Sequence, residues 1–148
     1  MVARFVIHEH HATNLHFDLR LEIGGVLKSW AVPKGVSMNP ADKRLAIEVP
    51  DHSVGYINYE GTIAEGNYGA GAVVIWDKGE FETENDPAEQ LETGRLNFTF
   101  HGAKLRGAFS LREMTGRKGQ WLIIKSADEF ADAQWKIETV LPPKAKRL

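Results

Sequence analysis

Apolar and polar residues alternate along most of this chain, in segments rich in β-branched and aromatic side chains. This pattern predicts strands at residues 4–9, 15–22, 26–32, 44–49, 72–77, 95–100, 105–112 and 120–125. Gly24-Gly25 predicts a tight turn between the second and third strands, and Asp77-Lys78-Gly79 predicts another turn. Many short strands favour an all-β fold, and we expect a closed antiparallel β-barrel of about eight strands.

Signals for helices are few. The clearest is at residues 85–94, where Asp86 can cap the helix, Pro87 suits its first position and Glu89 completes a capping box. A weaker capping pattern occurs at residues 126–130. The sequence therefore predicts one or two short helices beside the strands.

The length of 148 residues fits one domain with one hydrophobic core. We expect this single domain to span residues 1–148, with its core at about residues 4–141 and a flexible basic tail at 142–148. The N-terminus lacks the apolar run of a signal peptide and no segment has the length of a membrane helix, so we expect a cytoplasmic protein without membrane contact.

Cysteine is absent, which excludes disulfides, thiolate catalysis and cysteine-ligated zinc. Any metal site must then be built from His, Asp and Glu. The net charge of −2 argues weakly against nucleic acid as a partner. However, residues 1–94 hold 7 basic and 15 acidic side chains, whereas residues 95–148 hold 11 basic and 5 acidic ones. The basic part is either a solvated surface or one that follows a phosphate backbone.

The predicted strand at residues 15–22 has two chemically different faces, because side chains alternate along a strand. Its apolar face, which should point into the core, carries Leu15, Phe17, Leu19 and Leu21. Its polar face carries His16, Asp18, Arg20 and Glu22. Positions two residues apart lie about 6.5–7 Å apart on the same face, so one metal ion could take ligands from His16 and Asp18. Spacing alone leaves open whether His8, His10 or His11 supplies a third ligand.

Two imidazoles and one carboxylate suit Mn, Fe or Zn. The guanidinium of Arg20 pairs well with two oxygens of a phosphate, so metal and arginine together indicate phosphoester chemistry. A merely solvated strand face is the alternative interpretation. His52 and Tyr56 also stand apart from the apolar pattern, although each alone is more typical of a structural residue.

Several spaced blocks of this sequence resemble one known family. They are His10-x5-His16-x-Asp18-x-Arg20-Leu21-Glu22, residues 25–35 (GVLKSWAVPKG), Asp51-His52-x3-Tyr56, Glu60-Gly61, Gly66-x-Tyr68-Gly69-Ala70-Gly71, Trp76-Asp77-x-Gly79, Leu105-Arg106-Gly107 and residues 121–125 (WLIIK). In this order they are similar to the 3′-phosphoesterase domain of bacterial ATP-dependent DNA ligase D, which in some prokaryotes is a free-standing protein. The resemblance covers roughly residues 4–126.

The resemblance implies a β-barrel enzyme that removes 3′-terminal ribonucleosides and 3′-phosphates from a DNA primer strand during end joining. It implies one divalent ion, most often Mn²⁺, with Zn²⁺ or Co²⁺ as alternatives, held by His10, His16 and Asp18. Arg20, His52 and Tyr56 would contact the phosphate as catalytic groups. Lys34 and Arg44 would add positive charge near the phosphate, and Glu22 would support the metal ligands or act only structurally.

The partners implied are a DNA primer–template and a separate ligase or polymerase that acts in trans on the same DNA end. We expect the protein to be a monomer. Two other classes of function remain open. One is a non-catalytic module that binds nucleic-acid ends or a partner. The other is a metal oxygenase of the cupin type, which also uses two histidines and one carboxylate on a β-barrel. Arg20 and the basic C-terminal part favour phosphate over a neutral organic substrate.

Overall fold

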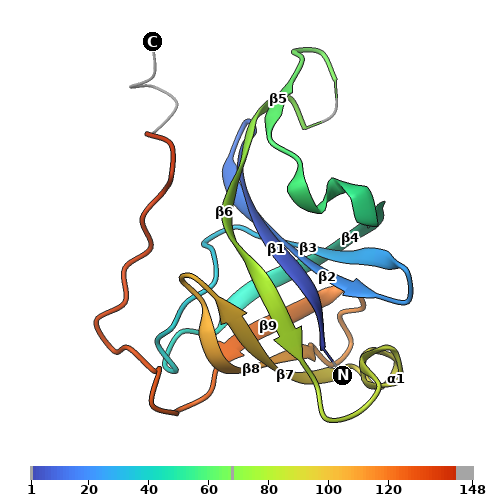
Figure 1. Cartoon of the computed structure of the whole chain (residues 1–148), viewed down its shortest axis with the longest axis vertical. Helices are drawn as coiled ribbons and strands as arrows, with labels where there is room; N and C mark the ends of the chain where they lie inside the picture. The colour runs from blue at the N-terminus through green and yellow to red at the C-terminus, as the bar shows by residue number, and fades with distance from the viewer. Residues whose placement is uncertain (1, 68, 143–148) are drawn as a thin grey trace.

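Strands make up most of the computed structural model, which describes residues 2–67 and 69–142 (Figure 1). The elements are β1 (Val2–His11), β2 (Leu15–Ile23), β3 (Val26–Val32), β4 (Arg44–Ser53), the 3₁₀ helix η1 (Val54–Asn58), β5 (Gly61–Ile63), β6 (Gly71–Glu82), α1 (Pro87–Glu92), β7 (Arg95–Gly102), β8 (Arg106–Glu113) and β9 (Gln120–Lys125).

Eight of these strands form a closed antiparallel barrel. Hydrogen-bonded neighbours follow the order β1-β2-β3-β4-β9-β8-β7-β6, and β6 pairs again with β1 to close the sheet. The short strand β5 is added outside the barrel, on the part of β6 that does not pair with β7. Between Ile7 and His8 the register of β1 against β6 shifts, because Trp76 is an extra residue on β6. The expected barrel of about eight strands is confirmed.

Alternation of side chains sorts each barrel strand into an inner and an outer face. On β1 and β2 the inner face carries Phe5, Ile7, Phe17, Leu19 and Leu21, all buried in the main core cluster. Leu15 is an exception, since it is exposed at the start of β2. The outer face of the same two strands carries the polar residues singled out above. It is partly covered by η1, whose Ile57 packs on Val6 and Leu27 in a second small cluster.

All eight predicted strands are present, and Gly24-Gly25 forms the turn between β2 and β3 with positive φ angles of 64° and 81°. The helix predicted at residues 85–94 is α1, and the Asp86 side chain accepts a hydrogen bond from the backbone N–H of Ala88. Neither β5 nor η1 was predicted from the sequence. Residues 143–148 of the predicted flexible tail lie outside the described residues.

Two local predictions are wrong. Asp77-Lys78-Gly79 is not a turn, because β6 continues through it; the buried carboxylate of Asp77 instead accepts backbone N–H groups of Ala103, Lys104 and Leu105. Residues 126–130 form no helix. Asp128 there pairs with the buried ammonium of Lys125 and accepts the N–H of Phe130.

After β9 the chain continues as an extended segment, residues 126–142, whose Trp135 and Ile137 pack against the main core cluster (Figure 1). Its end is held by Glu9, which points into the barrel and has no exposed surface. The Glu9 carboxylate accepts the backbone N–H groups of Val140 and Leu141 at 2.6 and 2.9 Å, and it contacts His11 Nε2 at 2.7 Å. Glu9 therefore joins the first strand to the last described residues.

Replacing this carboxylate should destabilise the fold. Glu9→Ala leaves two backbone N–H groups and the His11 imidazole without their buried acceptor, and we expect the free energy of unfolding to fall by about 3 kcal/mol. Urea unfolding followed by circular dichroism measures the change. Glu65→Ala, at an exposed loop position, is the control and should change the free energy by less than about 0.5 kcal/mol. Equal stability of the two variants would show that Glu9 does not anchor the C-terminal segment.

Candidate metal and phosphate site

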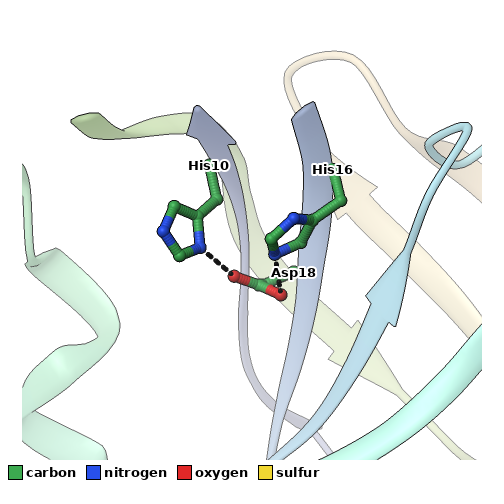
Figure 2. Close-up of side chains that lie close together, drawn as sticks. All are labelled: His10, His16 and Asp18. Atoms are coloured by element: carbon green, nitrogen blue, oxygen red, sulfur yellow. Dashed lines mark hydrogen bonds and ion pairs between the residues drawn. The ribbon is translucent and has the colours of Figure 1, made fainter. Parts of the chain in front are cut away.

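Three side chains on the outer face of β1 and β2 converge on one point (Figure 2). His10 on β1 is paired across the ladder with His16 on β2, and Asp18 follows on the same face of β2. One ligand atom from each residue lies within 4.8 Å of the others. His10 Nδ1 is 3.3 Å from one Asp18 oxygen and His16 Nε2 is 3.2 Å from the other. The ladder pairing of His10 with His16 thus selects His10 from the three histidines that spacing left open.

The second ring nitrogen of each histidine contacts a backbone carbonyl. His10 Nε2 lies 2.6 Å from Gly69 O, and His16 Nδ1 lies 3.1 Å from Asn14 O. Because a carbonyl oxygen only accepts, these nitrogens must carry the proton and donate it. In a neutral imidazole the other nitrogen then holds a lone pair, directed at the space beside Asp18. This is the arrangement by which protein histidines bind metals.

The charges of the three residues fit a divalent ion as well. Burial alone raises the pKa of Asp18, but hydrogen bonds from His10 and His16 and the charge of Arg20 outweigh it and lower that pKa below its ordinary value. The hydrogen bond to Asp18 likewise raises the pKa of His16. A carboxylate that stays ionised beside two imidazole nitrogens is a suitable ligand set for a divalent cation.

Arg20 lies beside the triad and is almost fully buried. Its guanidinium donates to Asp18 Oδ2 at 3.3 Å, to Ser29 Oγ at 2.9 Å and to His8 Nδ1 at 3.1 Å. Its guanidinium carbon lies over the ring of Tyr56, 5.0 Å from the ring centroid. Three of the five N–H groups of Arg20 are thus used, and two have no acceptor among the described residues.

His52 and Tyr56 reach this site from a different part of the chain. His52 lies near the end of β4 and Tyr56 in η1, and their rings stack with centroids 4.5 Å apart. Tyr59 stacks on the other side of Tyr56 at 4.7 Å. Burial first and the charge of Arg20 second lower the pKa of His52, while burial raises the pKa of Tyr56. At neutral pH both side chains are therefore uncharged hydrogen-bonding groups beside a buried arginine.

Comparison with known proteins shows the family of this chain. The sequence model of the DNA Ligase D 3′-phosphoesterase domain matches residues 8–113, which include every residue of the site. The chain belongs to this family.

Relatives of this 3′-phosphoesterase domain are much longer proteins. The chain is 46% identical over 127 residues to the multifunctional non-homologous end joining protein LigD of Pseudomonas aeruginosa, covering 84% of this chain and 15% of the relative. It is 43% identical over 132 residues to the protein of the same name in Mycolicibacterium smegmatis, covering 85% and 17%. A third relative is the multifunctional non-homologous end joining DNA repair protein LigD of Mycobacterium tuberculosis, 39% identical over 141 residues, covering 93% and 18%. The chain spans about a sixth of the length of these relatives.

Three other predicted site residues of this family member do not contact the triad. Lys34 is exposed and makes no hydrogen bond or ion pair with a described residue. Arg44 pairs with Asp42 at 3.3 Å, and Glu22 pairs with Arg4 at 2.7 Å. Roles for Lys34 and Arg44 at the phosphate, and for Glu22 behind the metal ligands, stay predictions.

None of the helices in the described part of the chain is long and apolar enough to span a bilayer.

The remaining histidines have distinct surroundings. His11 points into the barrel and contacts Glu9, so it lies on the opposite face of β1 from His10. His101 is exposed and pairs with Glu82 at 2.6 Å. His8 has no exposed surface and shares the outer face of β1 with His10. Burial first and the charge of Arg20 second lower the pKa of His8 to about 4, which keeps its ring neutral at physiological pH.

Ser29 and Gly69 were not predicted as site residues from the sequence. Ser29 accepts a hydrogen bond from Arg20 and donates one to Leu27 O at 3.0 Å. Gly69 has a positive φ of 74°, and its carbonyl orients His10. The only signal for either residue was its place in a family block, because the contact of Ser29 with Arg20 depends on the strand register.

Gly69 offers a direct test of how His10 is oriented. A Cβ at residue 69 would lie 3.2 Å from His10 Cε1, whereas one at Gly66, which also has a positive φ, would meet nothing within 4 Å. Both Gly69→Ala and Gly66→Ala strain the loop, but only the first displaces the imidazole. We expect Gly69→Ala to weaken Mn²⁺ binding about 10- to 100-fold, measured by calorimetry, and Gly66→Ala to change it little. Equal affinities in the two variants would contradict a role for Gly69 in holding His10.

Proposed function

We propose that this chain is a metal-dependent phosphoesterase that repairs DNA 3′ ends. It removes 3′-terminal ribonucleosides and 3′-phosphates from a primer strand and leaves a 3′-hydroxyl for a ligase or polymerase acting in trans. One observation carries the proposal: a buried arginine with two unused N–H groups lies against a His–His–Asp triad suited to a divalent ion. Family membership and the end-joining function named for the relatives support it.

His10 Nδ1, His16 Nε2 and a carboxylate oxygen of Asp18 would hold the ion. When bound, a divalent ion at this point supplies a Lewis acid for the phosphate oxygens, and Mn²⁺ is the preferred candidate, with Zn²⁺ and Co²⁺ as alternatives. Gly69 O and Asn14 O keep the two imidazoles in the required tautomer. Asp18 also accepts a hydrogen bond from Arg20, so one carboxylate links the metal ligands to the phosphate-binding arginine.

Arg20 binds the phosphate and offsets the charge that develops on its oxygens. Its two unused N–H groups form a donor pair for oxygen atoms, in the geometry that guanidinium groups share with phosphates. Its other three N–H groups are bound to His8, Ser29 and Asp18, so the guanidinium is held in place before the substrate arrives. A donor fixed in advance stabilises the transition state more than one that must reorganise.

His52 on β4 and Tyr56 in η1 act as neutral donors beside Arg20. Neither the His52 ring nitrogens nor the Tyr56 hydroxyl is bonded to another described residue, so both remain available to phosphate oxygens. A ring N–H of His52 donates a hydrogen bond to the phosphate, and Tyr56 orients the phosphate through its hydroxyl. Lys34 and Arg44 would attract the flanking strand of the DNA through their charge.

Incubation with a labelled primer–template that ends in one ribonucleotide tests this function. With Mn²⁺ present we expect the primer to lose its terminal ribonucleoside and then the remaining 3′-phosphate, and excess chelator should stop both steps. Tight binding to the primer–template without any shortening would favour the non-catalytic module. Full activity in the presence of chelator would contradict the metal-dependent mechanism.

A further inference from the structure

His8 connects the two segments that form the proposed phosphate site. Its Nδ1 lies 3.1 Å from Arg20 Nε, and its Nε2 lies 3.0 Å from the backbone oxygen of Tyr59. Arginine only donates, so Nδ1 must be the acceptor, and the proton on Nε2 is then donated to Tyr59 O. One neutral tautomer satisfies both contacts, and the edge of the ring also meets Tyr56 at a centroid distance of 5.2 Å.

The segment from β4 to β5 has other contacts as well. The ladder of β4 with β3 pairs His52 with Leu27, Ile57 packs on Val6 and Leu27, and Glu60 accepts the backbone N–H of Ile75. None of these contacts reaches Arg20. The ring of Tyr56 lies on the Arg20 guanidinium, but such a contact leaves rotation within the guanidinium plane free. The hydrogen bonds of His8 are directional, and they set both the guanidinium and the backbone at Tyr59 against the same strand, β1.

We propose that His8 is a positioning residue that aligns Arg20 with the segment bearing His52 and Tyr56, so that both face one phosphate. This inference rests on the proposed phosphoesterase function. It goes beyond that function by assigning a role to a histidine whose hydrogen bonds go to Arg20 and Tyr59 O and not to a proposed metal ligand. Ser29 and Asp18 accept hydrogen bonds from the terminal nitrogens Nη1 and Nη2 of Arg20, and His8 accepts one from Nε.

The test compares two replacements of similar size. Leucine at position 8 fills the space without either hydrogen bond, whereas the amide of glutamine offers an acceptor for Arg20 Nε and a donor for Tyr59 O. On a primer–template with a 3′-phosphate end, we expect His8→Leu to lower kcat about 10- to 100-fold with KM and the Mn²⁺ requirement nearly unchanged. His8→Gln should recover most of the lost rate, and His101→Gln, at an exposed position, should behave like the wild type.

A double-mutant comparison shows whether His8 acts through Arg20. Added to Arg20→Ala, His8→Leu should lower kcat by less than about twofold, because the side chain it positions is already gone. If the losses of kcat in the two single variants multiply in the double variant, the proposal is overturned. A wild-type kcat in His8→Leu, or a higher Mn²⁺ requirement in that variant, would overturn it as well. If His8→Leu does not fold, His8→Asn takes its place, since its shorter amide reaches only one of the two partners and must fall below His8→Gln.

A readout independent of activity separates this proposal from the proposed function. In ¹⁵N-edited NMR spectra the Arg20 Nε–H signal should exchange slowly with solvent in the wild type and in His8→Gln, and rapidly in His8→Leu. An inactive wild type with this pattern would defeat the phosphoesterase proposal but retain the role of His8 in holding Arg20. Equal exchange in the wild type and both variants would defeat the role of His8.

Discussion

His16→Ala should abolish phosphoesterase activity while the barrel stays folded. His16 supplies one of the three ligand atoms of the triad, and the loss of even an outer partner of a metal ligand costs about 10- to 100-fold. We therefore expect a fall in kcat/KM of at least about a hundredfold on a 3′-phosphate end at a fixed Mn²⁺ concentration. The imidazole is partly exposed near the start of β2, so its removal opens no cavity in the core.

His101→Ala is the matched control for this variant. Its imidazole also faces a carboxylate, that of Glu82, but on β7 and away from the triad. Thermal unfolding of both variants should resemble that of the wild type, and only His16→Ala should lose activity. A His16→Ala variant with wild-type rates over a full range of Mn²⁺ concentrations would show that the triad is not the metal centre.

Arg20→Lys should also be severely impaired, although it keeps the positive charge. An ammonium group cannot reproduce three hydrogen bonds in one plane and still present two more donors to a phosphate. We expect a loss of about 2–3 kcal/mol in transition-state stabilisation, or roughly a 30- to 150-fold fall in kcat/KM. Steady-state kinetics on the 3′-phosphate primer–template measure this effect.

The control here is Arg4→Lys, on the same outer face of β1 and β2. Arg4 pairs with Glu22 through an exposed guanidinium and contacts none of the triad. Its replacement should leave kcat/KM within about twofold of the wild type. Wild-type turnover in Arg20→Lys would contradict the assigned role of Arg20, because a point charge would then suffice.

The barrel strands were predictable because each buries one face and alternates over enough residues to be recognised. β5 has only three residues, and η1 has no helical repeat, so neither leaves a pattern in the sequence. The predicted turn at Asp77 failed for a physical reason. Asp and Gly favour turns locally, but here the Asp77 carboxylate accepts three N–H groups from residues 103–105, far away in the sequence. A local rule could not anticipate those partners.

For the site, the sequence alone indicated the part that lies on one strand. His16, Asp18 and Arg20 share a face of β2 because side chains alternate there. The choice of His10 over His8 and His11 depends on strand register, which pairs His10 with His16 and turns His11 into the barrel. His52 and Tyr56 come from a segment that only the fold brings to Arg20, so the family resemblance alone indicated them.

Anomalous diffraction from crystals soaked in MnCl₂ locates the metal. We expect one strong manganese peak bound by His10 Nδ1, His16 Nε2 and an Asp18 oxygen, and the peak should vanish in His16→Ala. A manganese peak at another place, with the space between these three side chains empty, would show that they do not form the metal site.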